Sequence, residues 1–185
     1  MKHIKLISLF ACIMACAGTA SANQLFNFDF SIGNNAGYGS LDTVDQGGGN
    51  FLAVSGALTV TDSTDAADIG IFSLLAGGPG NTNSPSGKFY FNNVLHSLSN
   101  PVLDLAGLLF TGNGLEVNIY GNDIDTYSFE SWNGARYNVA DVGQIRSTFN
   151  LTPVAQAQAA VPEPTTLALF GLGLVGFGLS RRKRV

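Results

Sequence analysis

Acidic side chains are the first candidates for chemistry in this 185-residue chain. Asp62, Asp65 and Asp68 recur every three residues, and this oxygen-rich spacing could supply ligands to Ca²⁺. Asp123 and Asp125 form a second oxygen-rich turn. Neither run has the residue order of an EF-hand loop, so solvated acids in turns between strands are the simpler interpretation. We therefore expect no cofactor, and calcium is the one alternative.

A pair of carboxylates is the second candidate, because two carboxyl groups that face each other across a cleft can hydrolyse a glycoside. Glu116 and Glu130 are the only glutamates between residues 23 and 160. Both fall on outward positions of the strand alternation, which is typical of ordinary surface acids. His96 is the only histidine in that region, so there are too few histidines for a His-based metal site and only one candidate base for a catalytic triad. We expect no catalytic or metal-binding residues and a non-enzymatic protein, with a secreted hydrolase as the weakest hypothesis.

Aromatic side chains on an open sheet face are the third candidate, because their rings can stack on the apolar faces of sugars. Four aromatics either alternate opposite to the predicted buried residues of their strands or stand where the alternation does not assign a face: Tyr90, Tyr120, Trp132 and Tyr137. Such residues more often fill a second core. Specific carbohydrate binding is therefore the alternative to a structural role.

These candidates lie in a region of short alternating segments separated by turns. Phe26, Phe28, Phe30 and Ile32 alternate with polar residues, which predicts a half-buried strand over 24–32. Further strands are predicted at 51–61, 69–75, 88–95, 102–110, 115–120, 127–132, 136–139 and 144–151. Gly-rich residues 33–50 and 76–87 predict loops, and Asn133-Gly134 predicts a hairpin. About nine strands and no long helix predict an all-β domain over 23–151, an antiparallel β-sandwich with a β-barrel as the alternative.

The N-terminus has the three parts of a secretory signal. Lys2 and Lys5 precede an apolar run, and Ala20-Ser21-Ala22 supplies a small-residue cleavage site. Residues 1–22 therefore predict a signal helix that signal peptidase removes. A cut before Cys16, which would give a lipoprotein, is the rival processing.

Charge and cysteine content exclude several classes of function. Residues 23–160 hold three basic and twelve acidic residues, a net charge of −9, whereas the whole chain carries −4. An acidic domain is repelled by phosphate backbones, so nucleic-acid binding is excluded. Cys12 and Cys16 are the only cysteines and both lie in the signal, so the mature chain holds its fold without disulfides or thiol chemistry.

Residues 152–160 predict a linker, and the last 25 residues combine three elements in order. Val161-Pro162-Glu163-Pro164 favours an extended backbone, because each proline locks its own φ and biases the residue before it away from helix. The uncharged residues 165–180 predict a transmembrane helix of about 24 Å, and bilayer thinning closes the gap to the ~30 Å hydrocarbon core. Four basic residues then hold its cytoplasmic end: Arg181, Arg182, Lys183 and Arg184.

This tail closely resembles the PEP-CTERM sorting signals of Gram-negative bacteria. The resemblance implies that an exosortase, an integral-membrane enzyme, cuts near Pro162-Glu163-Pro164 after a transient stay in the inner membrane. It also implies release to the cell surface or extracellular matrix, in species that make exopolysaccharide and form biofilm. The same kind of tail is also called an ice-binding protein C-terminal domain, but that name concerns the tail alone.

Parts of the preceding domain also look familiar. The stretches 92–95, 103–111, 115–122 and 127–129 are similar to an uncharacterised exported domain that often precedes this tail. That similarity implies a shared β fold and brings no activity with it.

Overall fold

The computed structural model describes residues 23–78, 80–145 and 147–155. The predicted signal helix, the C-terminal transmembrane helix and all the sorting and processing residues lie outside these ranges. Within them, no helix is long and apolar enough to cross a bilayer.

Twelve strands and one short 3₁₀ helix make up the described chain. They are β1 (Asn23–Ile32), β2 (Asn35–Gly47), β3 (Asn50–Asp62), η2 (Ala66–Asp68), β4 (Gly70–Leu74), β5 (Thr82–Asn83), β6 (Tyr90–Phe91), β7 (Val94–His96), β8 (Leu108–Gly112), β9 (Leu115–Asp123), β10 (Thr126–Trp132), β11 (Tyr137–Ile145) and β12 (Thr148–Pro153). The all-β prediction is confirmed.

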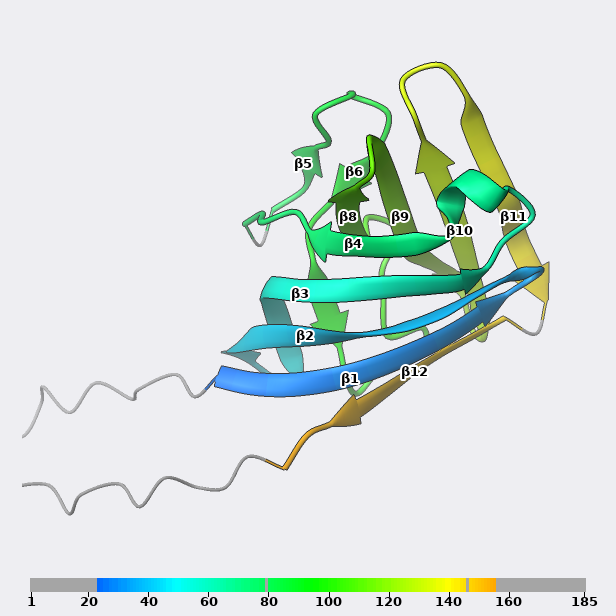
Figure 1. The fold of residues 1–185 in the computed structure, drawn as a ribbon. Helices are drawn as coiled ribbons and strands as arrows, with labels where there is room; N and C mark the ends of the chain where they lie inside the picture. Colours follow the sequence, from blue (N-terminus) through cyan, green and yellow to red (C-terminus); the bar gives the residue numbers. More distant parts are fainter. Residues whose placement is uncertain (1–22, 79, 146, 156–185) are drawn as a thin grey trace, which may run out of the picture. The chain divides into compact units, whose positions relative to one another are not determined.

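Ten of these strands form one antiparallel sheet. Their order is β11-β10-β9-β8-β4-β3-β2-β1-β12, with β7 beside β3, and β5 pairs separately with β6. In Figure 1, β1 to β4 and β12 run across the view while β8 to β11 run up behind them. The sheet therefore folds over on itself into a nearly barrel-shaped unit, which fits the barrel alternative.

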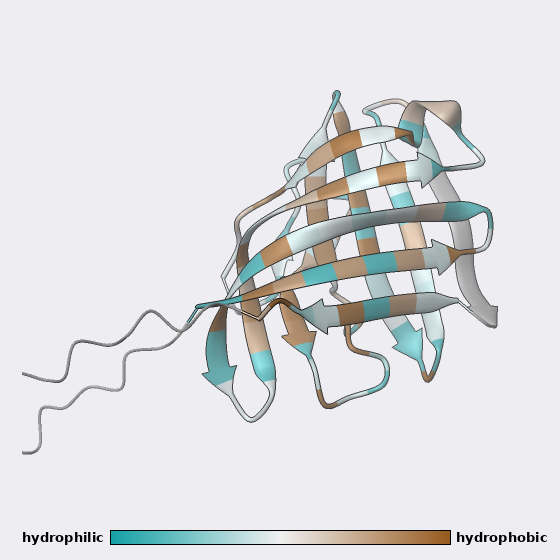
Figure 2. Cartoon of the chain, turned by 60° about the horizontal axis from the view of Figure 1, so that its bottom comes forward, coloured by the Kyte–Doolittle hydropathy of each residue, from teal (hydrophilic) through white to brown (hydrophobic). Residues whose placement is uncertain are grey.

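A stripe of phenylalanines on β1 joins the two halves of this sheet. Phe26, Phe28 and Phe30 are each 4% exposed or less, as their alternation predicted. The Phe28 ring stacks on Phe149 of β12 with centroids 5.2 Å apart, and the Phe30 ring stacks on Phe129 of β10 at 5.8 Å. Figure 2 shows the resulting alternation of hydrophobic and hydrophilic residues along the strands. The rings of β1 therefore contact both the neighbouring strand β12 and the strand β10 across the core. Through these contacts β1 fixes how the sheet closes.

The prediction of a loop over residues 33–50 was wrong, because most of this stretch is β2. Its glycines are needed in the strand. A Cβ on Gly39 would lie 2.5 Å from Cζ of Phe28 and 2.1 Å from the Ala57 carbonyl oxygen. A Cβ on Gly37 would lie 2.7 Å from Cε1 of Phe30. The rings on β1 thus fill the space that side chains of β2 would otherwise take.

The predicted strand over 102–110 begins only at Leu108. The Asp104 carboxylate accepts hydrogen bonds from the backbone N–H groups of Ala106 (2.9 Å) and Gly107 (3.0 Å). Such a local side-chain bond competes with strand pairing and favours a turn. The segment from 75 to 107 instead contributes Leu75, Phe89 and Phe91 to a second small core with Leu109 and Trp132.

Replacing Gly39 with alanine is expected to destabilise the mature chain by about 1–3 kcal/mol, because the added methyl overpacks against Phe28 and a backbone carbonyl. Urea denaturation followed by circular dichroism measures the change. Gly78→Ala is the matched control, since a Cβ there meets nothing within 4 Å. Equal unfolding midpoints for the two variants would contradict the packing argument.

Candidate functional site

The three regularly spaced aspartates do not converge on one point. The Asp65 carboxylate lies 2.8 Å from the guanidinium of Arg136, and Asp68 is 1% exposed. Asp68 accepts hydrogen bonds from the hydroxyls of Ser131 (2.6 Å) and Ser63 (3.1 Å). These contacts hold η2 against β10 and the β10–β11 hairpin. Among the described residues, no group of three His, Cys, Asp or Glu could hold a metal ion.

Replacing Asp68 with alanine is expected to lower the free energy of unfolding by about 2–3 kcal/mol, because two serine hydroxyls lose a charged acceptor in a buried site. Thermal or urea unfolding of the mature chain measures the loss. Asp62→Ala removes an exposed carboxylate at the end of β3 and should change stability by less than about 0.5 kcal/mol. Similar effects of the two substitutions would show that Asp68 is not a structural acid.

The two glutamates are buried, so the prediction that they are exposed surface acids was wrong. Glu116 is 9% exposed and Glu130 is 7% exposed. The reason is that the segment 75–107 covers the face of β9 and β10 from which they project. Glu116 accepts hydrogen bonds from the backbone N–H of Ser86 (2.8 Å) and from its hydroxyl (2.5 Å).

The strand register places the two glutamates on the same face of neighbouring strands. Glu130 lies opposite Asn118 and Trp132 lies opposite Glu116, so the glutamates are diagonal neighbours. Glu130 accepts hydrogen bonds from the hydroxyls of Tyr120, at 2.7 Å, and Tyr137. Each carboxylate is thus held by hydroxyl or amide donors of the protein itself.

The tyrosines that bond Glu130 resist ionisation. Burial, together with the hydrogen bond to Glu130, raises the pKa of Tyr120 to about 12. The same two causes, in the same order, raise the pKa of Tyr137 further. Both hydroxyls therefore keep their protons, and donate to Glu130, well above neutral pH.

Because the folded-state pKa of these tyrosines exceeds the unfolded value of about 10, their stabilising effect is complete below pH ~10 and is lost as pH rises toward and beyond 12. We expect the stability of the mature chain to fall over this window. The double variant Tyr120→Phe/Tyr137→Phe should show a shallower fall, and Tyr90→Phe, at an exposed position, should behave like the parent. Urea denaturation at stepped alkaline pH measures this, and identical slopes for all three chains would contradict it.

Three of the four aromatics proposed as a sugar platform lie together. The centroids of the Trp132 and Tyr137 rings are 6.4 Å apart, and the hydroxyls of Tyr120 and Tyr137 both donate to Glu130. Trp132 packs into the second small core, and the ammonium of Lys88 lies 4.7 Å from its ring centroid. Tyr120 is half-buried in its bond to Glu130. Tyr90 (64%) and Tyr137 (42%) remain exposed, on β6 and β11. Trp132 and Tyr120 therefore have partners within the domain, and Trp132 also lines a surface depression of about 450 Å³ together with Glu116.

His96 ends β7 and also has partners within the domain. Its Nδ1 lies 2.8 Å from Oδ1 of Asn50, and its Nε2 lies 3.8 Å from the Asp104 carboxylate. These contacts join β7 to the start of β3 and to the turn around Asp104, which precedes β8.

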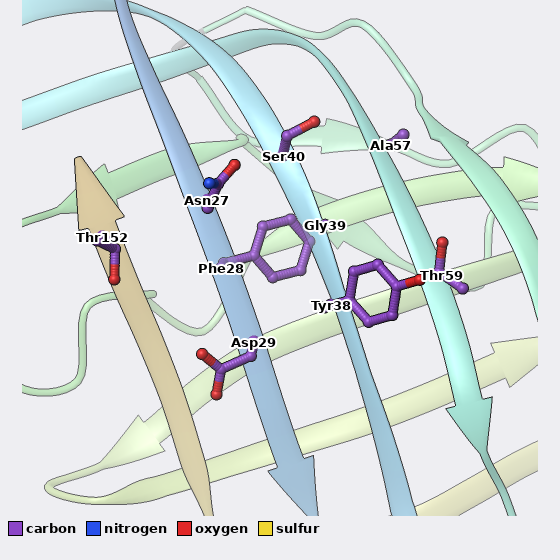
Figure 3. Close-up of a pocket in the computed structure, with 9 residues that line it drawn as sticks. All are labelled: Asn27, Phe28, Asp29, Tyr38, Gly39, Ser40, Ala57, Thr59 and Thr152. Atoms are coloured by element: carbon purple, nitrogen blue, oxygen red, sulfur yellow. The ribbon is translucent and has the colours of Figure 1, made fainter. Parts of the chain in front are cut away.

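A shallow depression lies on the outer face of β12, β1, β2 and β3, with a volume of about 470 Å³ (Figure 3). We call it the outer depression. The ring of Tyr38, which is 57% exposed, lies between Asp29 of β1 and Thr59 of β3 in the strand register. A second row carries Thr152, Asn27 and Ser40 across β12, β1 and β2.

The outer depression thus combines an exposed aromatic ring with a carboxylate, an amide and hydroxyls. This mixture suits a polyhydroxylated ligand, whose hydroxyls bond to polar groups while an apolar face stacks on the ring. The sequence analysis missed Tyr38 because residues 33–50 were predicted as a loop. No local signal marked it, because the alternation of exposed Tyr38 and Asp42 with buried Leu41 and Thr43 is visible only in the folded chain.

The comparison with protein families decides the sorting route. Residues 160–183 match the model of the PEP-CTERM protein-sorting motif. This chain carries a PEP-CTERM sorting signal. A protein with this signal is processed by an exosortase and sorted to the cell surface or the extracellular space. No curated protein and no solved structure matches the chain.

Proposed function

We propose that this PEP-CTERM protein is a non-enzymatic component of the cell surface or extracellular matrix that associates with exopolysaccharide. Signal peptidase removes residues 1–22, the C-terminal helix holds the chain transiently in the inner membrane, and exosortase releases it near Pro162-Glu163-Pro164. The single observation that carries the proposal is the sorting motif at residues 160–183.

The carboxylates of the domain support a non-enzymatic role. Glu116 is bonded by Ser86, Glu130 by two tyrosines, and Asp68 by two serines. A general acid or base needs access to a substrate proton, whereas these three carboxylates are buried and bonded to donors of the domain itself.

The positions of the two chain ends support processing at both sides. Gln24 donates a side-chain hydrogen bond to the carbonyl of Val154 (3.0 Å), and the N–H of Val154 donates to the carbonyl of Leu25 (2.8 Å). The start of β1 and the end of β12 are therefore paired neighbours (Figure 1). Cuts before Asn23 and after Val161 leave every strand that the structure describes in place.

Mass spectrometry of the protein recovered from the cell surface and medium tests the processing. We expect an N-terminus at Asn23 and a C-terminus near Pro162-Glu163-Pro164. A variant with all three of these residues replaced by alanine should stay in the membrane fraction and keep Arg184. Parent protein that still carries Arg184 outside the cell, or in the cytosol, would contradict the proposal.

The outer depression favours a second candidate function, specific carbohydrate binding. Tyr38 supplies the exposed ring, and Asn27, Asp29 and Thr152 supply polar groups around it. Co-sedimentation with exopolysaccharide purified from the producing cells tests this. Tyr38→Ala should weaken binding about tenfold, a loss of ~1.4 kcal/mol. Tyr90→Ala removes an equally exposed ring elsewhere and should leave binding unchanged. Equal retention of both variants would contradict specific binding at this depression while leaving the sorting route untouched.

A further inference from the structure

β12 is the last strand of the sheet on its side. It pairs with β1 through six residue pairs, from Phe26 opposite Pro153 to Ser31 opposite Thr148. On its other side, the N–H of Tyr127 in β10 donates to the hydroxyl of Ser147, at 2.5 Å, just before β12 begins. Beyond that point, none of the described strands forms a ladder with this edge. An edge strand of this kind presents backbone donors and acceptors that can pair with another strand.

Two adjoining depressions run beside β12. The larger, of about 670 Å³, is lined by Thr148, Phe149 and Asn150 together with the β9–β10 turn. The smaller, of about 360 Å³, is lined by Leu151 and Pro153, and Val102 borders both. Ile124, which is 66% exposed, borders the larger one. The edge therefore has space beside it and an exposed apolar side chain that a partner would cover.

The charge distribution favours approach of a second copy at this strand. Residues 23–160 carry a net charge of −9, so two copies repel each other over most of their surface. Residues 147–155, which include all of β12, contain no charged side chain. The neighbouring carboxylates Asp29 and Asp125 accept hydrogen bonds from Asn150 and Asn100. The strand itself therefore adds no like-charge repulsion when two copies meet.

The sequence of β12 is self-complementary when the strand runs antiparallel to itself. With Asn150 on the two-fold axis, Thr148 lies opposite Thr152 of the other copy, and Phe149 lies opposite Leu151. Thr148, Asn150 and Thr152 are exposed, whereas Phe149 is buried and Leu151 is half-buried. Both faces of the pair thus match, with polar residues on the outer face and apolar residues on the inner face.

We infer that the mature protein associates with a second copy of itself through antiparallel pairing of the two β12 edges. The two sheets then become one continuous sheet across a two-fold axis, an isologous interface in which each copy supplies the same strand. This association does not depend on polysaccharide binding or on the sorting route.

Cysteine cross-linking tests the pairing and its register, because both native cysteines lie in residues 1–22. Mature Asn150→Cys should form a disulfide-linked dimer under mild oxidation. An equimolar mixture of Thr148→Cys and Thr152→Cys should cross-link faster than either variant alone. Ser73→Cys, exposed on the central strand β4, is the collision control. If Asn150→Cys cross-links no faster than Ser73→Cys, the inference is overturned.

Sedimentation equilibrium of the cysteine-free mature protein tests the same contact without a covalent trap. The double variant Thr148→Glu/Thr152→Glu places like charges directly opposite each other on both sides of the axis and should weaken self-association at least about tenfold. The control Ile71→Glu/Ser73→Glu adds the same two charges at exposed positions of β4 and should leave the parent's association unchanged. Circular dichroism should show that both variants keep the strand content of the parent. A monomeric parent at all concentrations, or equal effects of the two double variants, would refute the β12 interface.

Discussion

The contact between the phenylalanines of β1 and the glycines of β2 is the constraint on which the rest of the fold depends. Phe28 and Phe30 lie where Cβ atoms on Gly39 and Gly37 would be. With those Cβ atoms absent, the two strands pair closely while the rings reach across to β12, β8 and β10. Each aromatic pair adds about 0.5–1.5 kcal/mol beyond the area it buries, and together they hold the two layers of one sheet against each other.

Closure of the sheet covers only one of its two faces, and the segment 75–107 covers part of the other. Ser86 reaches Glu116 from thirty residues away, and Asn93 accepts a hydrogen bond from Leu109 and donates one to the carbonyl of Leu75. As a result, β9 and β10 are buried on both faces over most of their length. Polar residues that alternate with the core thereby form hydrogen bonds within the domain and contribute to its stability.

The other half of the sheet, made of β1 to β3 with β12, leaves the outward-facing residues of its strands exposed. The outer depression crosses β12, β1, β2 and β3, and the edge of β12 borders it. Polar residues with short side chains dominate this face, and the ring of Tyr38 stands among them. The contacts that we propose for the domain lie on this face and at the β12 edge, whereas its buried acids and aromatic core carry its stability.

The sequence by itself determined those features that depend on neighbouring residues. The alternation in 24–32, the Asn133-Gly134 hairpin and the all-β class followed from local patterns, and the sorting tail was recognisable because an enzyme recognises it as a linear motif. Tertiary structure alone decided that a glycine-rich stretch is the strand β2, that Glu116 and Glu130 are buried, and that Tyr38 is the exposed ring. The physical reason is that a strand's second face is polar or buried according to what covers it. That cover comes from residues distant in sequence, so no local pattern records it.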